Sequence, residues 1–150
     1  MTASIFHASP EDTDELAPLF DAYRVFYRQP SNLEGARDFL RERLTNGDSA
    51  IILARDVATS NVAGFVQLYP SFTSTGMRRI WILNDLFVAP EFRRQGVGAH
   101  LLKAAREFAL GNGGIRMTLS TEKANTTAKS LYESMGWVRD DVFDHYTLTL

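Results

Sequence analysis

The sequence of 150 residues contains no cysteine. Disulfide bonds, thiolate nucleophiles and cysteine-ligated metal sites are therefore excluded, and the composition fits a reducing compartment. No stretch approaches the roughly 18 consecutive apolar residues that a membrane-spanning helix requires. The N-terminus also lacks a basic region followed by an apolar run. We therefore expect a cytoplasmic, soluble protein with no membrane partner.

An excess of charge of one sign is also lacking. Lysine and arginine number 16 against 18 aspartate and glutamate, which gives a net charge of −2. Because nucleic-acid-binding domains normally carry a basic surplus, no nucleic-acid partner is expected. The three histidines, His7, His100 and His145, do not have the spacing of metal ligands, so no metal site is predicted. A chain of this length can bury a core as a single domain, residues 1–150.

Hydrophobic periodicity divides the chain into strands and helices. Residues 79–88 are apolar on both faces, which favours a central strand covered on both sides. Gly64 lies inside a predicted strand and indicates a bulge or a close backbone neighbour. In chain order, strands are predicted at 4–8, 50–54, 62–69, 79–88, 115–120, 137–138 and 142–150, and helices at 10–27, 33–44, 96–111 and 125–136.

The element order is therefore β-α-α-β-β-β-α-β-α-β-β. Antiparallel hairpins fill the first half, and a strand–helix–strand crossover in the second half should be right-handed and parallel. This pattern predicts an α+β fold with a mixed, mostly antiparallel central sheet of about six to seven strands and helices on both faces.

The segment 84–98 joins a strand to a helix through a basic turn that contains Gly96 and Gly98. Backbone N–H groups at the start of that helix have no partner within the helix, so they can bind a pyrophosphate. Arg93 and Arg94 add positive charge there. The glycines alone equally permit a tight turn that binds no ligand. A P-loop is excluded because no Gly-Lys-Ser/Thr run exists, and a dinucleotide fingerprint fails at Leu101, where a third glycine is required.

Residues 87–98, Phe-Val-Ala-Pro-Glu-Phe-Arg-Arg-Gln-Gly-Val-Gly, resemble the acyl-CoA signature of the GNAT superfamily of N-acetyltransferases. The pattern Gln/Arg-x-x-Gly-x-Gly/Ala is met by Arg93, Gly96 and Gly98. The resemblance continues through Asn125 and through 131–137, Leu-Tyr-Glu-x-x-Gly-Trp. Residues 84–88 and 137–140 are most similar to the branch that contains polyamine, histone and amino-acid acetyltransferases.

The resemblance implies acetyl-CoA as co-substrate and direct acetyl transfer to an amine through a tetrahedral intermediate. The strand holding Leu86, Phe87 and Val88 would splay from its neighbour and face the pantetheine, with the Val88 amide as oxyanion donor. Asn125 would hold the pantetheine arm or order its turn. The pyrophosphate would be held by Arg93, Arg94, Gln95, Gly96, Val97, Gly98 and Ala99.

Tyr132 falls where the family places the tyrosine that protonates the departing thiolate, so the resemblance implies a general acid. The resemblance also implies that Tyr132 contacts the acetyl-CoA. However, Tyr132 shares an apolar helix stripe with Leu131 and Met135, where a tyrosine can simply pack in the core.

A general base is harder to identify. Several relatives carry Glu or His at the position that corresponds to Asn84, and asparagine cannot accept a proton at neutral pH. Asp85 is a candidate, although in a regular strand it points to the opposite face unless a bulge rotates it. A buried carboxylate that bonds a loop or helix backbone is the alternative reading of Asp85. Proton loss through water or directly to solvent also stays open.

The resemblance implies that the first helices and last strands shape the acceptor pocket, with substrate contacts from Tyr23, Tyr27, Asn84 and Tyr146. We expect acetylation of a primary amine of a small, polyamine or amino-acid-like molecule. The alternatives are acetylation of a protein lysine or N-terminus, and a non-catalytic acyl-CoA-binding regulatory module. The alternating final strand offers an edge for pairing, so a homodimer is expected.

Overall fold

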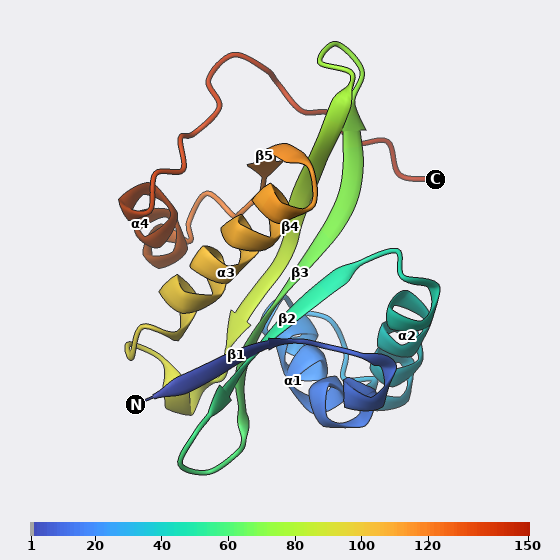
Figure 1. Ribbon diagram of the computed structural model, residues 1–150, viewed down its shortest axis with the longest axis vertical. Helices are drawn as coiled ribbons and strands as arrows, with labels where there is room; N and C mark the ends of the chain where they lie inside the picture. The colour runs from blue at the N-terminus through green and yellow to red at the C-terminus, as the bar shows by residue number, and fades with distance from the viewer. Residues whose placement is uncertain (1) are drawn as a thin grey trace. The chain divides into compact units, whose positions relative to one another are not determined.

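The structure is a computed structural model and describes residues 2–150. Backbone contacts divide the chain into two compact units, one ending at Ser120 and the other spanning Thr121–Leu150. The second unit contains α4 (Thr126–Ser134). The first contains β1 (Ala3–His7), η1 (Pro10–Asp12), α1 (Thr13–Phe26), α2 (Leu33–Asn46), β2 (Ala50–Asp56), β3 (Val62–Thr73), β4 (Arg78–Val88), η2 (Pro90–Phe92), α3 (Val97–Gly111) and β5 (Gly114–Thr118) (Figure 1).

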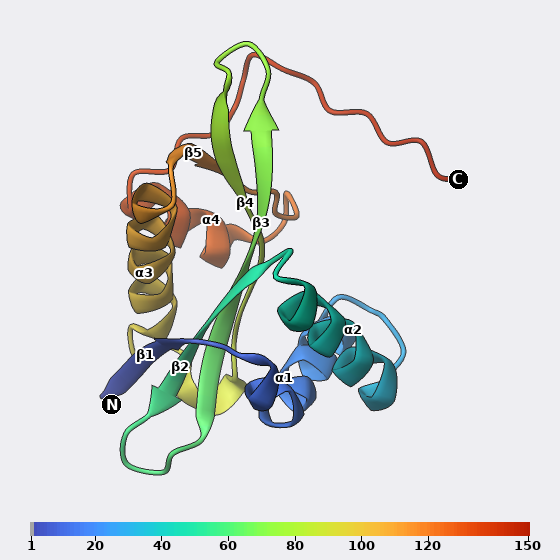
Figure 2. The ribbon, with the colours of Figure 1, turned by 45° about the vertical axis from the view of Figure 1, so that its right-hand side comes forward.

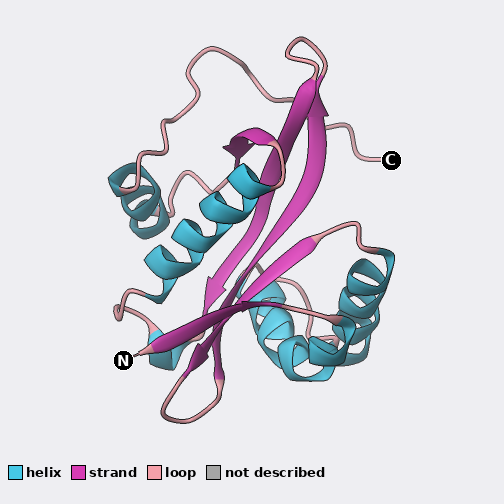
Figure 3. Cartoon of the chain, in the orientation of Figure 1, coloured by secondary structure: helices cyan, strands magenta, loops and turns pink. Residues whose placement is uncertain are grey.

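The strands form one sheet in the order β1-β2-β3-β4-β5 (Figure 3). The pairs β1–β2, β2–β3 and β3–β4 are antiparallel, and β5 is parallel to β4 because α3 carries the chain back between them. A parallel pair needs such a crossover, whereas antiparallel pairs can be joined by short turns. The predicted α+β class with a mixed, mostly antiparallel sheet is confirmed.

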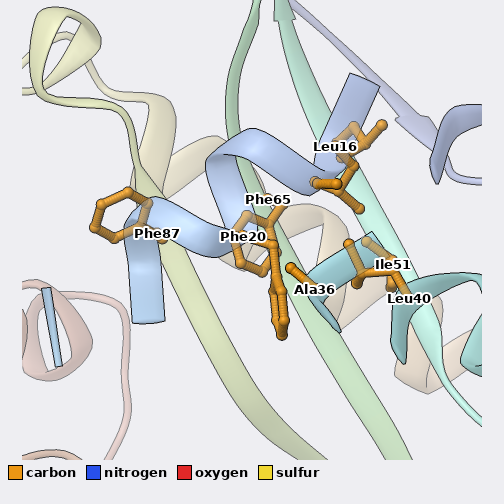
Figure 4. Close-up of a cluster of buried hydrophobic side chains, with 9 residues drawn as sticks. Leu16, Phe20, Ala36, Leu40, Ile51, Phe65 and Phe87 are labelled. Carbon is orange, nitrogen blue, oxygen red and sulfur yellow. The ribbon is translucent and has the colours of Figure 1, made fainter. Parts of the chain in front are cut away.

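Helices cover both faces of this sheet, as predicted (Figure 2). Phe65 packs into a buried cluster with residues of α1 and α2, including Leu16, Phe20, Ala36 and Leu40 (Figure 4). Successive side chains of a strand alternate between faces. The preceding residue, Gly64, accordingly lies under α3.

Gly64 also fulfils the expectation of a close backbone neighbour. A Cβ at this position would lie 2.9 Å from the Phe87 carbonyl oxygen and 3.1 Å from Leu101 Cδ1. The register between β2 and β3 shifts beside it, after Ala54, which is paired with Gly64. Glycine is therefore required here for α3 to approach the sheet.

The ends of α2 follow from its sequence. The Asn32 side chain accepts a hydrogen bond from the Gly35 N–H (2.9 Å) and caps the first turn. Gly47 ends the helix with φ 65°, the left-handed conformation that glycine adopts at no steric cost.

The Thr121–Leu150 unit contains the predicted helix and none of the predicted strands. Asn125 caps α4 by accepting from the Ala128 N–H (3.2 Å), and Gly136 follows the helix with φ 93°. The predicted strands at 137–138 and 142–150 are wrong: among residues 2–150 the sheet has five strands, not six or seven. Asp140 Oδ1 instead accepts the N–H groups of Val142 and Phe143 (2.9 and 3.2 Å), which makes a local turn.

Candidate functional site

The C-terminal half of β4 has an open edge. Its parallel ladder with β5 ends at the Ile82–Thr118 pair, whereas β4 continues through six further residues to Val88. Along this stretch β3 is its only strand neighbour in the described part of the chain. β4 and β5 are therefore not paired along residues 83–88, the region that includes Leu86, Phe87 and Val88.

The direction of the backbone groups on this edge follows from one hydrogen bond. The Ala89 N–H donates to the Ala63 carbonyl at 2.8 Å, so these two residues form a hydrogen-bonded pair across β3 and β4. Because bonded and non-bonded pairs alternate in an antiparallel ladder, Leu86 and Val88 direct their N–H and C=O groups away from β3. The Val88 carbonyl indeed accepts from Arg93 Nε (2.9 Å) on that side. The Val88 N–H consequently faces the open edge of β4.

α3 begins at Val97, after η2 and the turn at residues 93–96, and its start has no side-chain cap. Arg94 and Gly96 both adopt left-handed conformations, with φ 60° and 83°. The first helical bond runs from the His100 N–H to the Gly96 carbonyl (3.1 Å), so the amides of residues 97–99 precede the hydrogen-bond ladder. These amides and the helix dipole together suit an anion such as a pyrophosphate.

Two of the predicted phosphate-binding side chains also hold the turn itself. The Arg93 guanidinium stacks 5.5 Å from the Phe26 ring and 5.2 Å from the Phe87 ring, in addition to its bond with Val88. Gln95 Nε2 donates to the Glu91 carbonyl at 3.2 Å. The turn is therefore ordered by its own side chains, while the backbone amides supply the anion site.

A β-bulge at Asn84 determines where Asp85 points. Gln67 pairs with Asp85 and Leu68 pairs with Leu83, so Asn84 is the extra residue of β4. Asp85 consequently points to the face opposite Leu83, and it shares with Phe87 the face toward α1; it is 6% exposed, whereas Asn84 is exposed. The sequence alone allowed this outcome only if a bulge was present.

The Asp85 carboxylate is surrounded by side-chain donors. Gln67 Nε2 donates to Oδ2 at 2.7 Å, Asn84 Nδ2 donates to Oδ1 at 3.2 Å, and the Tyr23 hydroxyl also bonds the carboxylate. Burial raises the pKa of Asp85, and the hydrogen bonds from Tyr23, Gln67 and Asn84 oppose part of that rise. The bonds come from side chains of α1, β3 and β4, not from a loop or helix backbone.

Sequence reasoning missed two members of this group, Gln67 and Tyr69. Gln67 is fully buried, and its Oε1 has no hydrogen-bond partner. Burial and then the charge of Asp85 raise the pKa of Tyr69 to about 12, so its hydroxyl stays protonated at physiological pH. One signal was available: Gln67 interrupts an otherwise apolar strand, which is unusual for a residue facing a core.

An aromatic group from the end of α1 lies against the same face of β4. The Tyr23 ring centroid is 5.2 Å from that of Tyr27 and 5.8 Å from that of Phe87. Phe26 lies 5.8 Å from Phe87. The structure therefore brings together three of the four predicted acceptor contacts, Tyr23, Tyr27 and Asn84.

The remaining predicted site residues belong to the Thr121–Leu150 unit. Asn125 uses its side-chain oxygen to cap α4. Tyr132 lies in α4, partly buried, with its ring 6.1 Å from that of Trp137. Tyr146 is 92% exposed. Within residues 2–150 no group of three or more His, Asp or Glu side chains could hold a metal ion, and no helix could cross a membrane.

A family model described as the acetyltransferase (GNAT) family matches residues 16–137. The chain belongs to the GNAT acetyltransferase family. It is 48% identical to the uncharacterized N-acetyltransferase YhfO of Bacillus subtilis over 147 residues, 98% of this chain and 97% of that protein. A crystal structure of a probable acetyltransferase is 45% identical, with a TM-score of 0.93, and covers 98% of this chain and 97% of its own.

This GNAT acetyltransferase also matches an enzyme named for its acceptor. It is 35% identical to the thialysine N-epsilon-acetyltransferase of Bos taurus over 75 residues, 50% of this chain and 44% of that protein. The family uses acetyl-CoA as co-substrate. The open edge of β4 and the uncapped start of α3 fit the thioester and the pyrophosphate of that molecule, since one offers a backbone donor and the other an anion site.

Proposed function

We propose that this N-acetyltransferase transfers acetyl from acetyl-CoA to a primary amine of a small polyamine or amino-acid-like molecule. The observation that carries this proposal is the buried Asp85 carboxylate, held at the Asn84 bulge next to the open edge of β4. A primary amine is cationic at neutral pH, so a carboxylate attracts it and can also take its proton. The thialysine acetyltransferase relative, named for an amino-acid-like amine, supports the acceptor class.

On the donor side, the amides of residues 97–99 and the Arg94 side chain would hold the pyrophosphate. Leu86, Phe87 and Val88 would line the pantetheine and thioester, because their strand edge has no other strand partner. By family resemblance, Asn125 would hold the pantetheine arm or order its turn. Acetyl-CoA supplies an acyl group that is already activated as a thioester.

In the transfer step, the neutral amine forms a C–N bond to the acetyl carbon while the carbonyl becomes an oxyanion. The Val88 N–H would donate to that oxyanion. Collapse breaks the C–S bond, and the thiolate takes a proton that we assign to the Tyr132 hydroxyl by family resemblance. Asp85 would accept the proton that the nitrogen loses as the amide forms, whereas the proton that converts the cationic amine to its neutral form passes to solvent before attack. From the neutral amine onward, Asp85 takes up one proton and Tyr132 gives one.

A small acceptor is favoured by the loop that follows α1. Asp21 Oδ2 accepts from Ser31 Oγ (2.6 Å), and Asp21 Oδ1 accepts from the Asn32 N–H (2.7 Å). Arg24 donates to the Pro30 carbonyl at 3.1 Å. These bonds hold residues 30–32 against α1, whose end carries the aromatic side chains. A fixed loop at this place favours a closed pocket for a small molecule rather than an open groove for a protein chain. A non-catalytic role is disfavoured because Asp85 replaces the base that Asn84 cannot provide.

The test is release of free CoA, measured with DTNB, across a panel of polyamines, amino acids and lysine peptides. The chain has no cysteine, so the reagent reports CoA alone. Thiol release with small amines supports the proposal, and release only with peptides supports the protein-acetylating alternative. Absence of thiol with every acceptor would identify a binding module. Asp85→Asn should lower kcat/KM by about 100-fold, the usual effect of losing a general base.

A further inference from the structure

Arg93 lies in the exposed turn before α3, but its side chain reaches back to the end of β4. Its Nε donates to the Val88 carbonyl at 2.9 Å. Its guanidinium carbon lies 5.5 Å from the centre of the Phe26 ring and 5.2 Å from that of the Phe87 ring. Within residues 2–150 this guanidinium belongs to no ion pair, so no carboxylate of that range neutralises its charge. A positive charge is therefore held against the last residues of β4.

Val88 is fixed from both sides of its strand. On the side of β3, the Ala89 N–H donates to the Ala63 carbonyl, and the alternation of the ladder makes Phe87 the preceding hydrogen-bonded residue. On the open edge, the Val88 carbonyl accepts from Arg93. Of the two backbone groups that Val88 directs to this edge, the carbonyl is thus occupied, and the N–H faces the place proposed for the thioester.

Without a partner, the Val88 carbonyl would oppose the role proposed for the Val88 N–H. In an extended strand the N–H and C=O of one residue point to the same side. They are separated along the strand by no more than the rise of one residue, roughly 3.3 Å. An oxyanion bound to the N–H therefore lies beside a carbonyl oxygen, whose partial negative charge repels it. A guanidinium bonded to that oxygen offsets the repulsion through a charge-assisted hydrogen bond.

Two aromatic rings keep the guanidinium in this position. A guanidinium over the face of a ring is attracted by the negative charge of the π-system. Phe87 is 6% exposed and belongs to the buried cluster between the sheet and the first two helices (Figure 4). Phe26 is the last residue of α1, and its ring lies 5.8 Å from that of Phe87. The place of the charge is therefore set by α1 and β4, not by the turn alone.

We propose that Arg93 is a positioning residue for the oxyanion donor. It fixes the Val88 carbonyl and offsets its negative charge, so that the adjacent Val88 N–H can stabilise the tetrahedral intermediate. This proposal rests on the proposed acetyl transfer and adds a residue that acts on its transition state. It also gives different roles to two neighbouring arginines that the family resemblance places together at the pyrophosphate. Arg94 would bind the pyrophosphate, whereas Arg93 would act at the thioester.

Arg93→Gln and Arg94→Gln are a matched pair, because each removes one positive charge from the same exposed turn. Arg93→Gln should lower the first-turnover rate at saturating acetyl-CoA by about tenfold, since the oxyanion donor is misplaced but still present. Its KM for acetyl-CoA should also rise severalfold, because the turn before α3 loses a support. Arg94→Gln should raise that KM without a comparable loss of rate. Arg93→Lys keeps the charge and a donor, so it should recover part of the rate.

A second measurement needs no acceptor. The Val88 amide resonance of the isotope-labelled protein is followed while S-acetonyl-CoA, a thioether that retains a carbonyl group, is added to saturation. A hydrogen bond from the Val88 N–H to that carbonyl should move the resonance. We expect a smaller movement in Arg93→Gln than in the natural protein, and the full movement in Arg94→Gln.

The ring beneath the guanidinium provides a further variant if Arg93→Gln does not fold. Phe26→Leu removes a ring that is 51% exposed, and it should cause a smaller loss of the same rate. It should cause little further loss when combined with Arg93→Gln, because both changes act on one contact. Full additivity of the two rate losses would contradict this contact.

Three results would overturn the role of Arg93. They are an unchanged first-turnover rate in Arg93→Gln, an unchanged movement of the Val88 resonance in that variant, and equal rate losses in the Arg93 and Arg94 variants. The last result would show that the total charge of the turn matters and not the place of Arg93. Failure of the proposed function is a separate result, because the natural protein would then release no thiol with any amine.

Discussion

Gln67 and Asp85 face each other across β3 and β4, with Gln67 Nε2 donating to Asp85 Oδ2 at 2.7 Å. Both side chains are buried, and the pair sits at the point where the register of the two strands shifts. The bond is charge-assisted when the carboxylate is ionised, so Gln67 helps to stabilise the form of Asp85 that can accept a proton.

Gln67→Leu should therefore move the acidic limb of the kcat/KM profile to higher pH. The substitution removes a hydrogen bond that lowers the pKa of Asp85, while the burial that raises this pKa stays. The measurement is the pH profile of CoA release with the best small amine. Tyr69→Phe is the control, because it keeps all three hydrogen bonds of Asp85. An unmoved limb in Gln67→Leu would show that the kinetic ionisation is not that of Asp85.

Asp85→Asn should change stability in a pH-dependent way. Because the folded-state pKa of Asp85 is raised above 3.8, the stability that its neutral form contributes is present at lower pH. That stability is lost as the pH rises through the folded-state pKa. The asparagine variant cannot ionise, so its Tm relative to the natural protein should increase as the pH rises from 3.8 towards neutrality. Thermal unfolding at several pH values measures this difference, and a constant difference would contradict the raised pKa.

Gly96→Ala should weaken acetyl-CoA binding. Gly96 has φ 83° at the start of α3, and a side chain there forces strain of about 1–2 kcal/mol or a changed turn. Gly47→Ala is a matched control, because Gly47 has φ 65° at the end of α2 and also has no neighbour within 4 Å of a Cβ. We expect similar losses of Tm in both variants, but a KM for acetyl-CoA raised severalfold in Gly96→Ala alone. Equal KM values for acetyl-CoA in the two variants would show that the turn at Gly96 does not belong to the anion site.

Tyr132→Phe should lower kcat by about 100-fold and change the KM for acetyl-CoA much less, since a general acid acts mainly in the transition state. Steady-state kinetics of CoA release give both constants. Tyr69→Phe, which also removes one hydroxyl, is the control and should retain kcat. If Tyr132→Phe kept the natural kcat, Tyr132 would be a packing residue of α4 and not the acid.

Local patterns predicted the elements whose partners lie nearby in the sequence. The four predicted helices, at 10–27, 33–44, 96–111 and 125–136, depend on neighbouring residues, and the structure contains a helix at each place. The α+β class followed from the order of these elements. The turn at Gly96 was predictable for the same reason, because it combines a strand end, glycines and a helix start.

The surroundings of Asp85 depend on long-range register and could not be predicted in the same way. A one-residue bulge reverses the direction of every later side chain in the strand. The residues Asn84, Asp85 and Leu86 contain no local signal that predicts such a bulge. Residues 142–150 show the opposite failure. Their alternation indicates a preference for strand conformation. A strand also requires a partner strand, and the sequence does not specify one.

The contacts of Arg93 limit which residues can be substituted to change the acceptor range of this enzyme. Its side chain belongs to the loop before α3, yet it rests on Phe26 and Phe87 and holds the Val88 carbonyl. Replacing either ring to admit a bulkier amine would remove a support of that loop. Engineering of acceptor range at these two positions therefore carries a penalty in donor affinity, and variants with a changed Tyr27 offer a safer starting library.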